Sequence, residues 1–405
     1  MTDAAALSLL ALAAAQAAAG ARALRRLLPG RRRVPPPHPL VDPADPRRAL
    51  VGRARVSVVV AALNEARRIG PCLAGLMAQG PEVAEILVVD SRSTDGTRAL
   101  VEDAARRDPR VRLLTDPPLP AGWVGKVWAL EHGRAHATGD WVLGVDADTA
   151  PAPGLAAAVV AAAEAHGLDV VSFAPRFDGQ TAGERWIQPA MLATLVYRLG
   201  APTARPRTPG DVLANGQCFL VRRALLEAHG GYAPARASWA DDVALARHLM
   251  RRGARVGFLD GARLFTVRAY ASAGEAWREW GRSFDLADAS APARQALDLA
   301  TVTLAQGAPV PVLLALGGTA LGGTALGGVG LTGVGPAVLL GVNLALLGVR
   351  VGVLVATRRS YVRRGAPYWL SWTADPAAAA RLWVSTLRRP KGWRGRSFAL
   401  GTETG

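Results

Sequence analysis

Two aspartates stand one residue apart at the end of an apolar run, in the segment WVLGVDADTA at residues 141–150. A carboxylate at the end of a buried strand is costly unless it is paired or bound to a cation. Asp146 and Asp148 therefore suggest a divalent metal ion or another polar ligand. The alternative is a strand that ends in a solvated turn, and the residues at neighbouring strand ends decide between the two interpretations.

The aspartates belong to a region in which strands and helices alternate. Apolar segments of strand length lie at 55–63, 85–90, 111–115, 141–146 and 169–174, and segments of helix length lie at 65–79, 94–107, 125–137 and 153–166. Continuous apolar strands joined by helices predict an α/β fold with a mostly parallel, doubly wound sheet.

Polar residues follow several of these strands. Asn64 and Glu65 follow the first strand, Asp90 follows the second, and Asp146 and Asp148 follow the fourth. Ligands of such sheets bind outside the carboxyl ends of the strands. The pattern therefore predicts a binding site at this edge of the sheet and disfavours the solvated turn.

The phosphates of a nucleotide have no glycine-rich loop to bind them in this chain. No GxGxxG follows the first strand, and no GxxxxGK[ST] occurs. A nucleotide diphosphate would instead contact side chains and a Mg²⁺ or Mn²⁺ ion held by the paired aspartates. Lys126, near the start of a helix in GWVGKVWAL, fits this role, and the alternative for it is an ordinary surface lysine.

Apolar segments outside this region indicate a membrane protein. The chain has 405 residues and a net charge of +16, yet between Asp298 and Arg350 there is no Asp, Glu, Lys or Arg. That run predicts two crossings at about 299–327 and 335–356. The Ala-rich stretch 4–21 predicts a retained anchor, with a cleaved signal peptide as the alternative.

The basic residues gather beside the apolar segments. Arginine-rich stretches at 22–33, 358–364 and 388–396 predict that these flanks face the cytoplasm near anionic lipid. Nucleic-acid binding is disfavoured because no aromatic-rich RNA motif or zinc-finger spacing occurs. Asp375 and Pro376 interrupt residues 366–387, which predicts an interfacial or re-entrant segment and no third full crossing.

Five segments in order resemble family 2 glycosyltransferases of the GT-A fold, across roughly residues 55–285. They are VSVVVAALNEARRIGPCLAGL, ILVVDSRSTDGT, GKVWALEHGRAHATGDWVLGVDADT, ANGQCFLVRRALLEAHGGY and WADDVALARHLMRRG. More narrowly, GWVGKVWAL, the late membrane segments and the closing GWRGRSF resemble membrane glycosyltransferases near those of carotenoid and hopanoid pathways.

The resemblance implies roles for the matching residues. Asp90 would contact the nucleoside, Asp148 the metal ion, and Asp146 the nucleotide sugar or the metal ion. In WADDVAL, Asp242 would be the catalytic base, with Asp241 as the neighbouring candidate. The alternative is that this acidic pair lies at a helix N-terminus and complements the helix dipole. Both interpretations can hold at the same time.

Further donor-binding residues follow from the same resemblance. They are Gly216 and Gln217 in ANGQ, and Arg278 and Arg282 in WREWGRS. The tryptophans of WREWGRS suggest anchoring at the bilayer interface as the alternative. The family commonly has a second Asp where this chain has Ser91, which leaves open the nucleoside contact and the nucleobase that the donor carries. The QxxRW motif of processive members is altered, which favours a single transfer.

The expected function is an inverting glycosyltransferase that moves a sugar from a nucleotide-diphosphate sugar, expected to be a UDP-sugar, to a membrane lipid such as a carotenoid or other isoprenoid. The alternatives are a polyprenyl-phosphate glycosyltransferase, a processive polysaccharide synthase and a degenerate sugar-nucleotide-binding membrane scaffold. The expected protein is multi-pass in the cell membrane, with its catalytic domain in the cytoplasm. The expected parts are an anchor (1–24), a basic Pro-rich linker (25–54), a GT-A domain (55–290), two transmembrane helices (296–357) and a basic tail (358–405).

Overall fold

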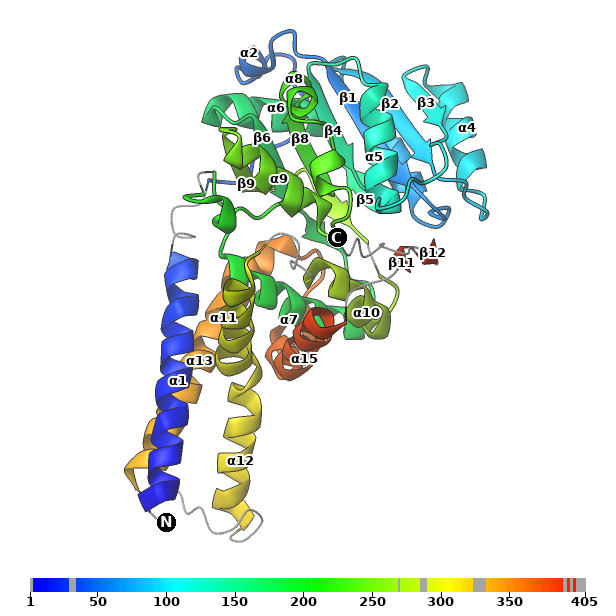
Figure 1. Cartoon of the computed structure of the whole chain (residues 1–405). Coiled ribbons are helices and arrows are strands. Elements are labelled where there is room, and N and C mark those ends of the chain that lie inside the picture. Colours follow the sequence, from blue (N-terminus) through cyan, green and yellow to red (C-terminus); the bar gives the residue numbers. More distant parts are fainter. Residues whose placement is uncertain are drawn as a thin grey trace. The chain divides into compact units, whose positions relative to one another are not determined.

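The chain forms two compact units. The computed structural model describes residues 3–28, 34–204, 206–268, 270–284, 290–322, 333–388, 392–393 and 396–397 (Figure 1). The sheet unit comprises Arg33–Asp178, Pro202–Ala269 and Pro390–Gly405, and the helical unit comprises Met1–Arg32, Gly179–Ala201 and Tyr270–Arg389.

A seven-stranded sheet is the centre of the sheet unit. Its strands are β1 (Val56–Ala62), β2 (Val83–Asp90), β3 (Val111–Leu114), β4 (Trp141–Val145), β6 (Val170–Ala174), β8 (Cys218–Arg222) and β9 (Val256–Asp260). They lie in the order β3-β2-β1-β4-β8-β6-β9. All neighbouring pairs are parallel except those that β8 makes with β4 and β6. The predicted α/β fold with a mostly parallel sheet is confirmed.

Helices and short strands complete the sheet unit. The helices are α2 (Arg48–Val51), α3 (Ile69–Met77), α4 (Thr97–Arg107), α5 (Gly125–Ala135), α6 (Leu155–His166), α8 (Arg223–Ala228), α9 (Asp241–Arg251) and the 3₁₀ turns η2 (Pro209–Asp211) and η3 (Ala233–Ala235). A small sheet has the order β5 (Thr149–Pro151), β10 (Phe265–Val267) and β7 (Arg176–Phe177), and β11 (Gly392–Trp393) pairs with β12 (Arg396–Ser397).

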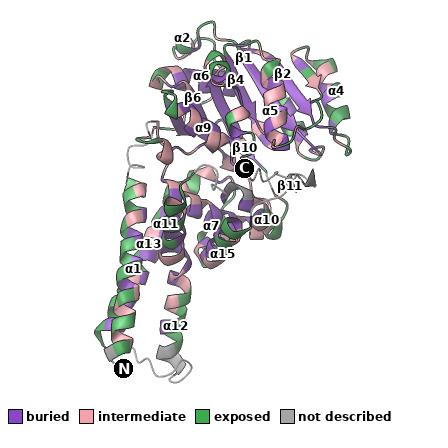
Figure 2. Ribbon diagram, in the orientation of Figure 1, coloured by how far each residue is buried: buried purple, intermediate pink, exposed green. Residues whose placement is uncertain are grey.

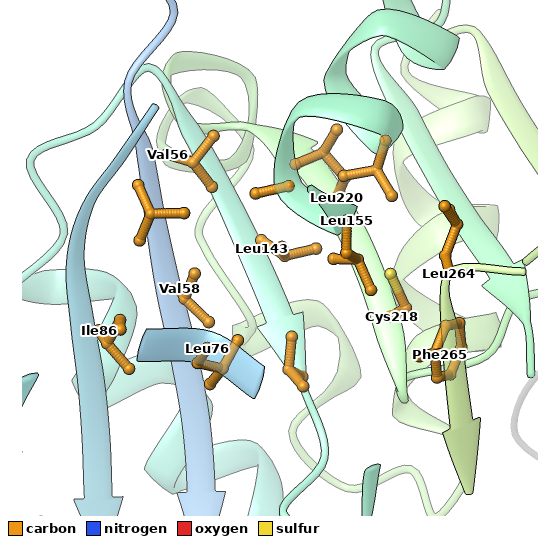
Figure 3. Close-up of a cluster of buried hydrophobic side chains, with 14 of the residues drawn as sticks. Val56, Val58, Leu76, Ile86, Leu143, Leu155, Cys218, Leu220, Leu264 and Phe265 are labelled. Atoms are coloured by element: carbon orange, nitrogen blue, oxygen red, sulfur yellow. The ribbon is translucent and has the colours of Figure 1, made fainter. Parts of the chain in front are cut away.

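Apolar side chains from strands and helices form the core of this unit. Every residue of β1 is buried, as expected for a central parallel strand covered on both faces (Figure 2). Figure 3 shows Val58, Ile86 and Leu143 from three neighbouring strands beside Leu76 of α3 and Leu155 of α6. Burial of each such side chain stabilises the fold by roughly 1.5–3 kcal/mol. The strand ends therefore project from a rigid framework.

The helical unit contains the apolar segments. Its helices are α1 (Asp3–Leu27), α7 (Ala182–Leu199), α10 (Ala273–Phe284), α11 (Pro292–Val302), the π-helical turn η4 (Thr303–Gly307), α12 (Pro309–Gly322), α13 (Val334–Thr357), η5 (Arg358–Ser360), α14 (Gly365–Trp369), η6 (Ser371–Ala374) and α15 (Asp375–Leu387). Three helices are long and apolar enough to cross a membrane: Ala4–Leu27, Pro292–Gly318 and Val334–Ser360. The first of the two predicted late crossings begins earlier than expected, and its predicted end at 327 lies outside the described residues.

Polar pairs join the apolar helices to their neighbours. Gln16 of α1 and Asn343 of α13 exchange two hydrogen bonds of 2.9 Å, and both side chains are fully buried. Arg350 of α13 pairs with Asp375 at the start of α15, with a shortest N···O distance of 2.8 Å. Because an unpaired amide or charge in an apolar bundle is costly, these pairs fix how the helices align. Asp375, which interrupts the apolar run in the sequence, thus has a structural partner.

Candidate active site

Two neighbouring strands bring four predicted site residues to one edge of the sheet. β4 and β8 are antiparallel, with Val145 opposite Cys218. Asp146 and Asp148 follow the end of β4, while Gly216 and Gln217 precede the start of β8. The pairing therefore places the DAD segment beside the ANGQ segment.

The turn after β4 is held by its own backbone. The carbonyl oxygen of Asp146 accepts hydrogen bonds from the backbone N–H of Thr149 at 3.1 Å and from its hydroxyl at 2.8 Å. The side chains of Asp146 and Asp148 are both half-buried. The turn thus presents two carboxylates one residue apart on a fixed backbone.

Lys126 lies at the start of α5 and pairs with the first of these aspartates. Its Nζ is 2.8 Å from Asp146 Oδ1. Burial alone would lower the pKa of Lys126, but the charges of Asp146, Asp241 and Asp242 outweigh it and raise the pKa. Lys126 is therefore charged at neutral pH and paired in the site, while its predicted contact with a donor diphosphate stays a prediction.

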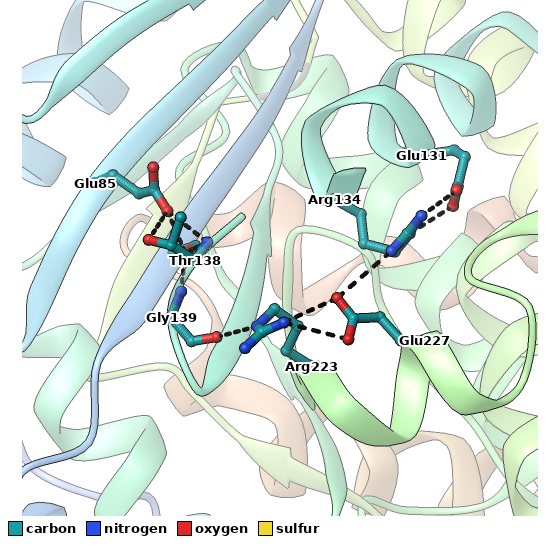
Figure 4. Close-up of polar contacts among 8 residues, drawn as sticks. Glu85, Glu131, Arg134, Thr138, Gly139, Arg223 and Glu227 are labelled. Atoms are coloured by element: carbon teal, nitrogen blue, oxygen red, sulfur yellow. Dashed lines mark hydrogen bonds and ion pairs between the residues drawn. The ribbon is translucent and has the colours of Figure 1, made fainter. Parts of the chain in front are cut away.

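A polar network on α5 and the segments beside it holds that helix in place (Figure 4). Arg134 pairs with Glu131 at 2.6 Å, and Glu131 accepts a hydrogen bond from the backbone N–H of Tyr232 at 2.9 Å. Arg223 of α8 donates to the carbonyl oxygen of Gly139 at 2.7 Å and pairs with Glu227 at 3.0 Å. These contacts fix α5, and with it Lys126, against the segment around β8.

Asp242 lies in the first turn of α9 and contacts the ANGQ segment. Its Oδ2 accepts a hydrogen bond from the backbone N–H of Gly216 at 2.7 Å, and its Oδ1 accepts one from the N–H of Val243 at 2.7 Å. A β-carbon on Gly216 would lie 3.2 Å from Lys126 Nζ and 3.7 Å from Asp242 Oδ2. Glycine at this position therefore lets the ammonium and the carboxylate approach the same backbone.

The acidic pair of α9 has a raised affinity for protons. Burial and the neighbouring charge of Asp241 raise the pKa of Asp242 to about 7, against the opposing effect of Lys126. Burial also raises the pKa of Asp241, and Asp146 adds to that shift. A carboxylate whose pKa is near neutral suits general-base chemistry, because it can both take and release a proton at working pH.

The ends of β1 and β2 are joined to each other. Asn64, at a positive φ of 55°, accepts a hydrogen bond through Oδ1 from the N–H of Thr94 at 2.9 Å. The N–H of Glu65 donates to the hydroxyl of Thr97 at 2.8 Å. Asp90 is 1% exposed and accepts from the N–H of Ser93 at 3.2 Å. These residues shape the two loops, and their predicted contact with a donor stays a prediction.

Two predicted donor-binding residues lie in the other unit. Arg278 and Arg282 belong to α10 of the helical unit, where the side chain of Arg278 is exposed. The side chain of Arg282 lies outside the described residues. Trp277 donates from Nε1 to the carbonyl oxygen of Ala377 at 3.1 Å. Donor binding by these arginines stays a prediction.

One buried carboxylate near this edge escaped the sequence analysis. Asp116 follows β3, is 5% exposed, and accepts a hydrogen bond from the Ser91 hydroxyl at 2.9 Å. The sequence signal was a polar residue just past the end of a strand, as for Asn64 after β1 and Asp146 after β4.

The carboxylates after β4 fit a metal ion that arrives with a phosphate ligand. Among the described residues there is no group of three or more His, Cys, Asp or Glu that could hold a metal ion by itself. Mg²⁺ and similar ions are commonly held by one or two carboxylates together with substrate phosphates and water. Asp146 and Asp148 provide that minimal donor set.

Comparison with protein families and curated proteins gives a consistent result. Residues 57–230 match the family described as Glycosyl transferase family 2. Dolichyl-phosphate beta-glucosyltransferase ALG5C of Trichomonas vaginalis is 38% identical over 100 residues, 23% of this chain and 28% of that protein. Succinoglycan biosynthesis protein ExoA of Rhizobium meliloti is 29% identical over 207 residues, 50% of this chain and 60% of that protein. Both matches span less than two thirds of the relative's length.

The fold matches a solved structure over nearly the whole chain. Mannosyltransferase PcManGT from Pyrobaculum calidifontis, in complex with GDP-Man and Mn²⁺, has a TM-score of 0.54 and 24% sequence identity. The match covers 96% of this chain and all of that one. At this identity the likeness concerns the fold alone, and it confirms the GT-A fold predicted from the sequence.

Proposed function

We propose, on the premise that this chain carries a family 2 glycosyltransferase domain of the GT-A fold, that it transfers a sugar from a nucleotide-diphosphate sugar to a membrane lipid with inversion at the anomeric carbon. One observation carries the proposal. Lys126 Nζ and the Asp242 carboxylate both reach Gly216, so a cation and a base share one small part of the site.

The chemistry assigns a separate task to each group. An acceptor hydroxyl oxygen forms a bond to the anomeric carbon while the bond from that carbon to the donor phosphate breaks. Asp242 takes the proton that the acceptor hydroxyl loses. Lys126 offsets the negative charge that grows on the departing diphosphate. Asp241, buried beside Lys126 and Asp146, contributes to the field that keeps the lysine charged.

Asp148, together with Asp146, would hold the Mg²⁺ or Mn²⁺ ion. Such an ion supplies Lewis-acid stabilisation of a leaving diphosphate. Support comes from the carboxylate spacing and from the solved mannosyltransferase, whose structure contains Mn²⁺. Because Asp146 is already paired with Lys126, Asp148 is the principal ligand in this proposal.

The acceptor is proposed to be a lipid because of the apolar helices. Three helices are long and apolar enough to cross a membrane, and such spans would tie the protein to a bilayer and raise the effective concentration of membrane-dissolved substrates. We favour a carotenoid or other isoprenoid acceptor and a UDP-sugar donor. A polyprenyl phosphate is the second candidate, favoured by the dolichyl-phosphate glucosyltransferase among the relatives. The arginine-rich flanks support placement in the cell membrane, with the sheet unit in the cytoplasm.

Lipid extracts test this function in cells. We expect mass spectrometry to find a lipid heavier by one sugar in cells that express the protein, and to find it missing from cells that lack it. Cells that express Asp242→Asn at the same level are the matched control and should resemble the deletion. An unchanged lipid profile together with a new soluble glycoside would contradict the lipid acceptor.

A further inference from the structure

Arg268 is an exposed arginine that lies opposite Asp148 at the end of the small sheet. In the antiparallel pair of β10 and β5, Val267 lies opposite Thr149, so the next pair in that register is Arg268 and Asp148. The backbone N–H of Arg268 donates to the carbonyl oxygen of Asp148 at 3.4 Å, which extends the pairing by one residue. Side chains directly opposite each other in an antiparallel pair share one face of the sheet. Arg268 is therefore on the same face as the proposed metal ligand.

The burial of neighbouring residues shows that this face is the open one. Phe265 and Val267 of β10 are buried in the core of the sheet unit (Figure 3). Thr266 between them is half-buried, and Arg268 is exposed. Because successive residues of a strand alternate between the two faces, Thr266 and Arg268 belong to the face that solvent reaches. Asp148, which is half-buried, shares that face.

The guanidinium of Arg268 is available to a ligand. Among the residues that the structure describes, it has no ion-pair or hydrogen-bond partner, and the contact of Arg268 is made by its backbone. Asp178 follows β7 on the other side of β10, and its N–H donates to the carbonyl oxygen of Val267 at 2.9 Å. Arginine presents a planar fork of donors that matches the oxygens of a phosphate.

A leaving diphosphate needs more positive charge than Lys126 can supply. The charge of Lys126 is already shared by Asp146, which is 2.8 Å away, and by the acidic pair of α9. A divalent ion would in turn be neutralised by the two carboxylates after β4. The negative charge on the diphosphate grows as its bond to the sugar breaks, so a further cation beside it would stabilise the transition state. Arg268 is the exposed cation that the register places next to Asp148.

From this placement we infer that Arg268 binds the phosphate that is bonded to the sugar of the donor and offsets the charge that this phosphate gains as the bond breaks. The inference rests on the proposed function, since it concerns the donor of that reaction. The electron pair of the broken bond stays on the phosphate oxygen, and the guanidinium donates hydrogen bonds to the phosphate without giving up a proton. The β-carbons of directly opposite residues are about 5 Å apart, so a phosphate on an ion held by Asp148 lies within reach of an arginine side chain.

The alternative is that Arg268 is a surface charge that only balances Asp148 and Asp178. Such a charge would contribute little to stability and would not distinguish between ligands. A residue that binds the sugar-linked phosphate distinguishes a nucleoside diphosphate from the monophosphate, which lacks that group. The ratio of these two affinities therefore separates the two roles.

Isothermal titration of the full-length protein in detergent with Mn²⁺ tests the inference, using UDP, GDP, UMP and GMP. In Arg268→Gln we expect the diphosphate that the wild type binds to lose at least about tenfold in affinity, and its monophosphate to lose less than about threefold. Mn²⁺ alone should bind this variant at least as tightly as the wild type, because a cation beside Asp148 has been removed. Arg252→Gln makes the same charge change at the exposed end of α9 remote from Asp242, and as the matched control it should keep the wild-type affinities.

Arg268→Lys gives a second measurement, because it keeps the charge and removes only the fork of donors. It should bind the diphosphate at least about threefold more tightly than Arg268→Gln. Equal losses for diphosphate and monophosphate in Arg268→Gln, a diphosphate affinity equal to that of the wild type, or equal binding by the two variants would overturn the inference and leave the proposed function intact. No binding of either diphosphate by the wild type would overturn both.

Discussion

Asp242→Asn is expected to lower turnover by about a hundredfold or more, as removal of a general base typically does. Asparagine retains the shape of the side chain and can still accept the hydrogen bond from Gly216, so donor binding should change little. Steady-state kinetics together with donor titration checks both parts. Asp103→Asn, a half-exposed site on α4 that pairs with Arg106 and Arg107, is the charge-matched control and should behave as wild type. Near-normal turnover in Asp242→Asn would mean that Asp241 is the general base, or that the general base does not lie on α9.

The dependence of turnover on pH tests the assignment of Asp242 as the general base independently. The pKa of Asp242 is raised to about 7, and the base acts only when ionised, so turnover should fall as the pH drops through that value. Asp241→Asn removes a repelling charge and should move the pH at which turnover falls to a lower value. Lys126→Met removes an attracting charge and should move it to higher pH. If turnover instead falls at the pH of an ordinary aspartate, and neither variant moves that pH, then Asp241 and Lys126 do not set the pKa of the base.

Chelation of divalent ions is expected to reduce transfer to below about one hundredth, with Mg²⁺ or Mn²⁺ restoring it, because loss of Lewis-acid stabilisation costs several kcal/mol. The variants distinguish the two aspartates. Asp148→Asn should raise the Mn²⁺ concentration needed for half-maximal activity by at least about tenfold.

Lys126→Met should lower turnover without raising the Mn²⁺ concentration needed for half-maximal activity. This variant leaves the carboxylates in place and removes only the cation paired with Asp146. Full activity in a chelator, or an unchanged Mn²⁺ requirement in Asp148→Asn, would show that the paired aspartates serve another purpose.

Elements with a strong apolar pattern were predictable from the sequence. The seven buried residues of β1 lie within the predicted strand 55–63, and β4 ends one residue before its predicted end. The predicted helix at 65–79 begins only at Ile69. Its first residues belong to a loop in which the N–H groups of Glu65 and Ala66 donate to Thr97 and Asp95. Apolar periodicity carries no information about such hydrogen bonds between loops.

Contacts between distant segments account for what the sequence analysis missed. Nothing in the order of residues shows that Lys126 pairs with Asp146, or that Gly216 keeps space for both Lys126 and Asp242. β8 escaped because it enters the sheet as an antiparallel strand outside the regular strand-helix alternation. Asp116 carried a signal in the sequence, but its hydrogen bond with Ser91 did not, because the two residues become neighbours only through the register of β2 and β3.

The most direct test of the central claim follows one labelled sugar. Purified full-length protein in liposomes that contain isoprenoid alcohols receives a nucleotide sugar labelled with ¹³C, and mass spectrometry then measures the label in the separated lipid and water phases. We predict label in the lipid phase, one nucleotide diphosphate released for each sugar transferred, and at most about one hundredth of both with Asp242→Asn. Label that stays in the water phase, as free sugar or on soluble acceptors, while the nucleotide diphosphate is released at the same rate would contradict it.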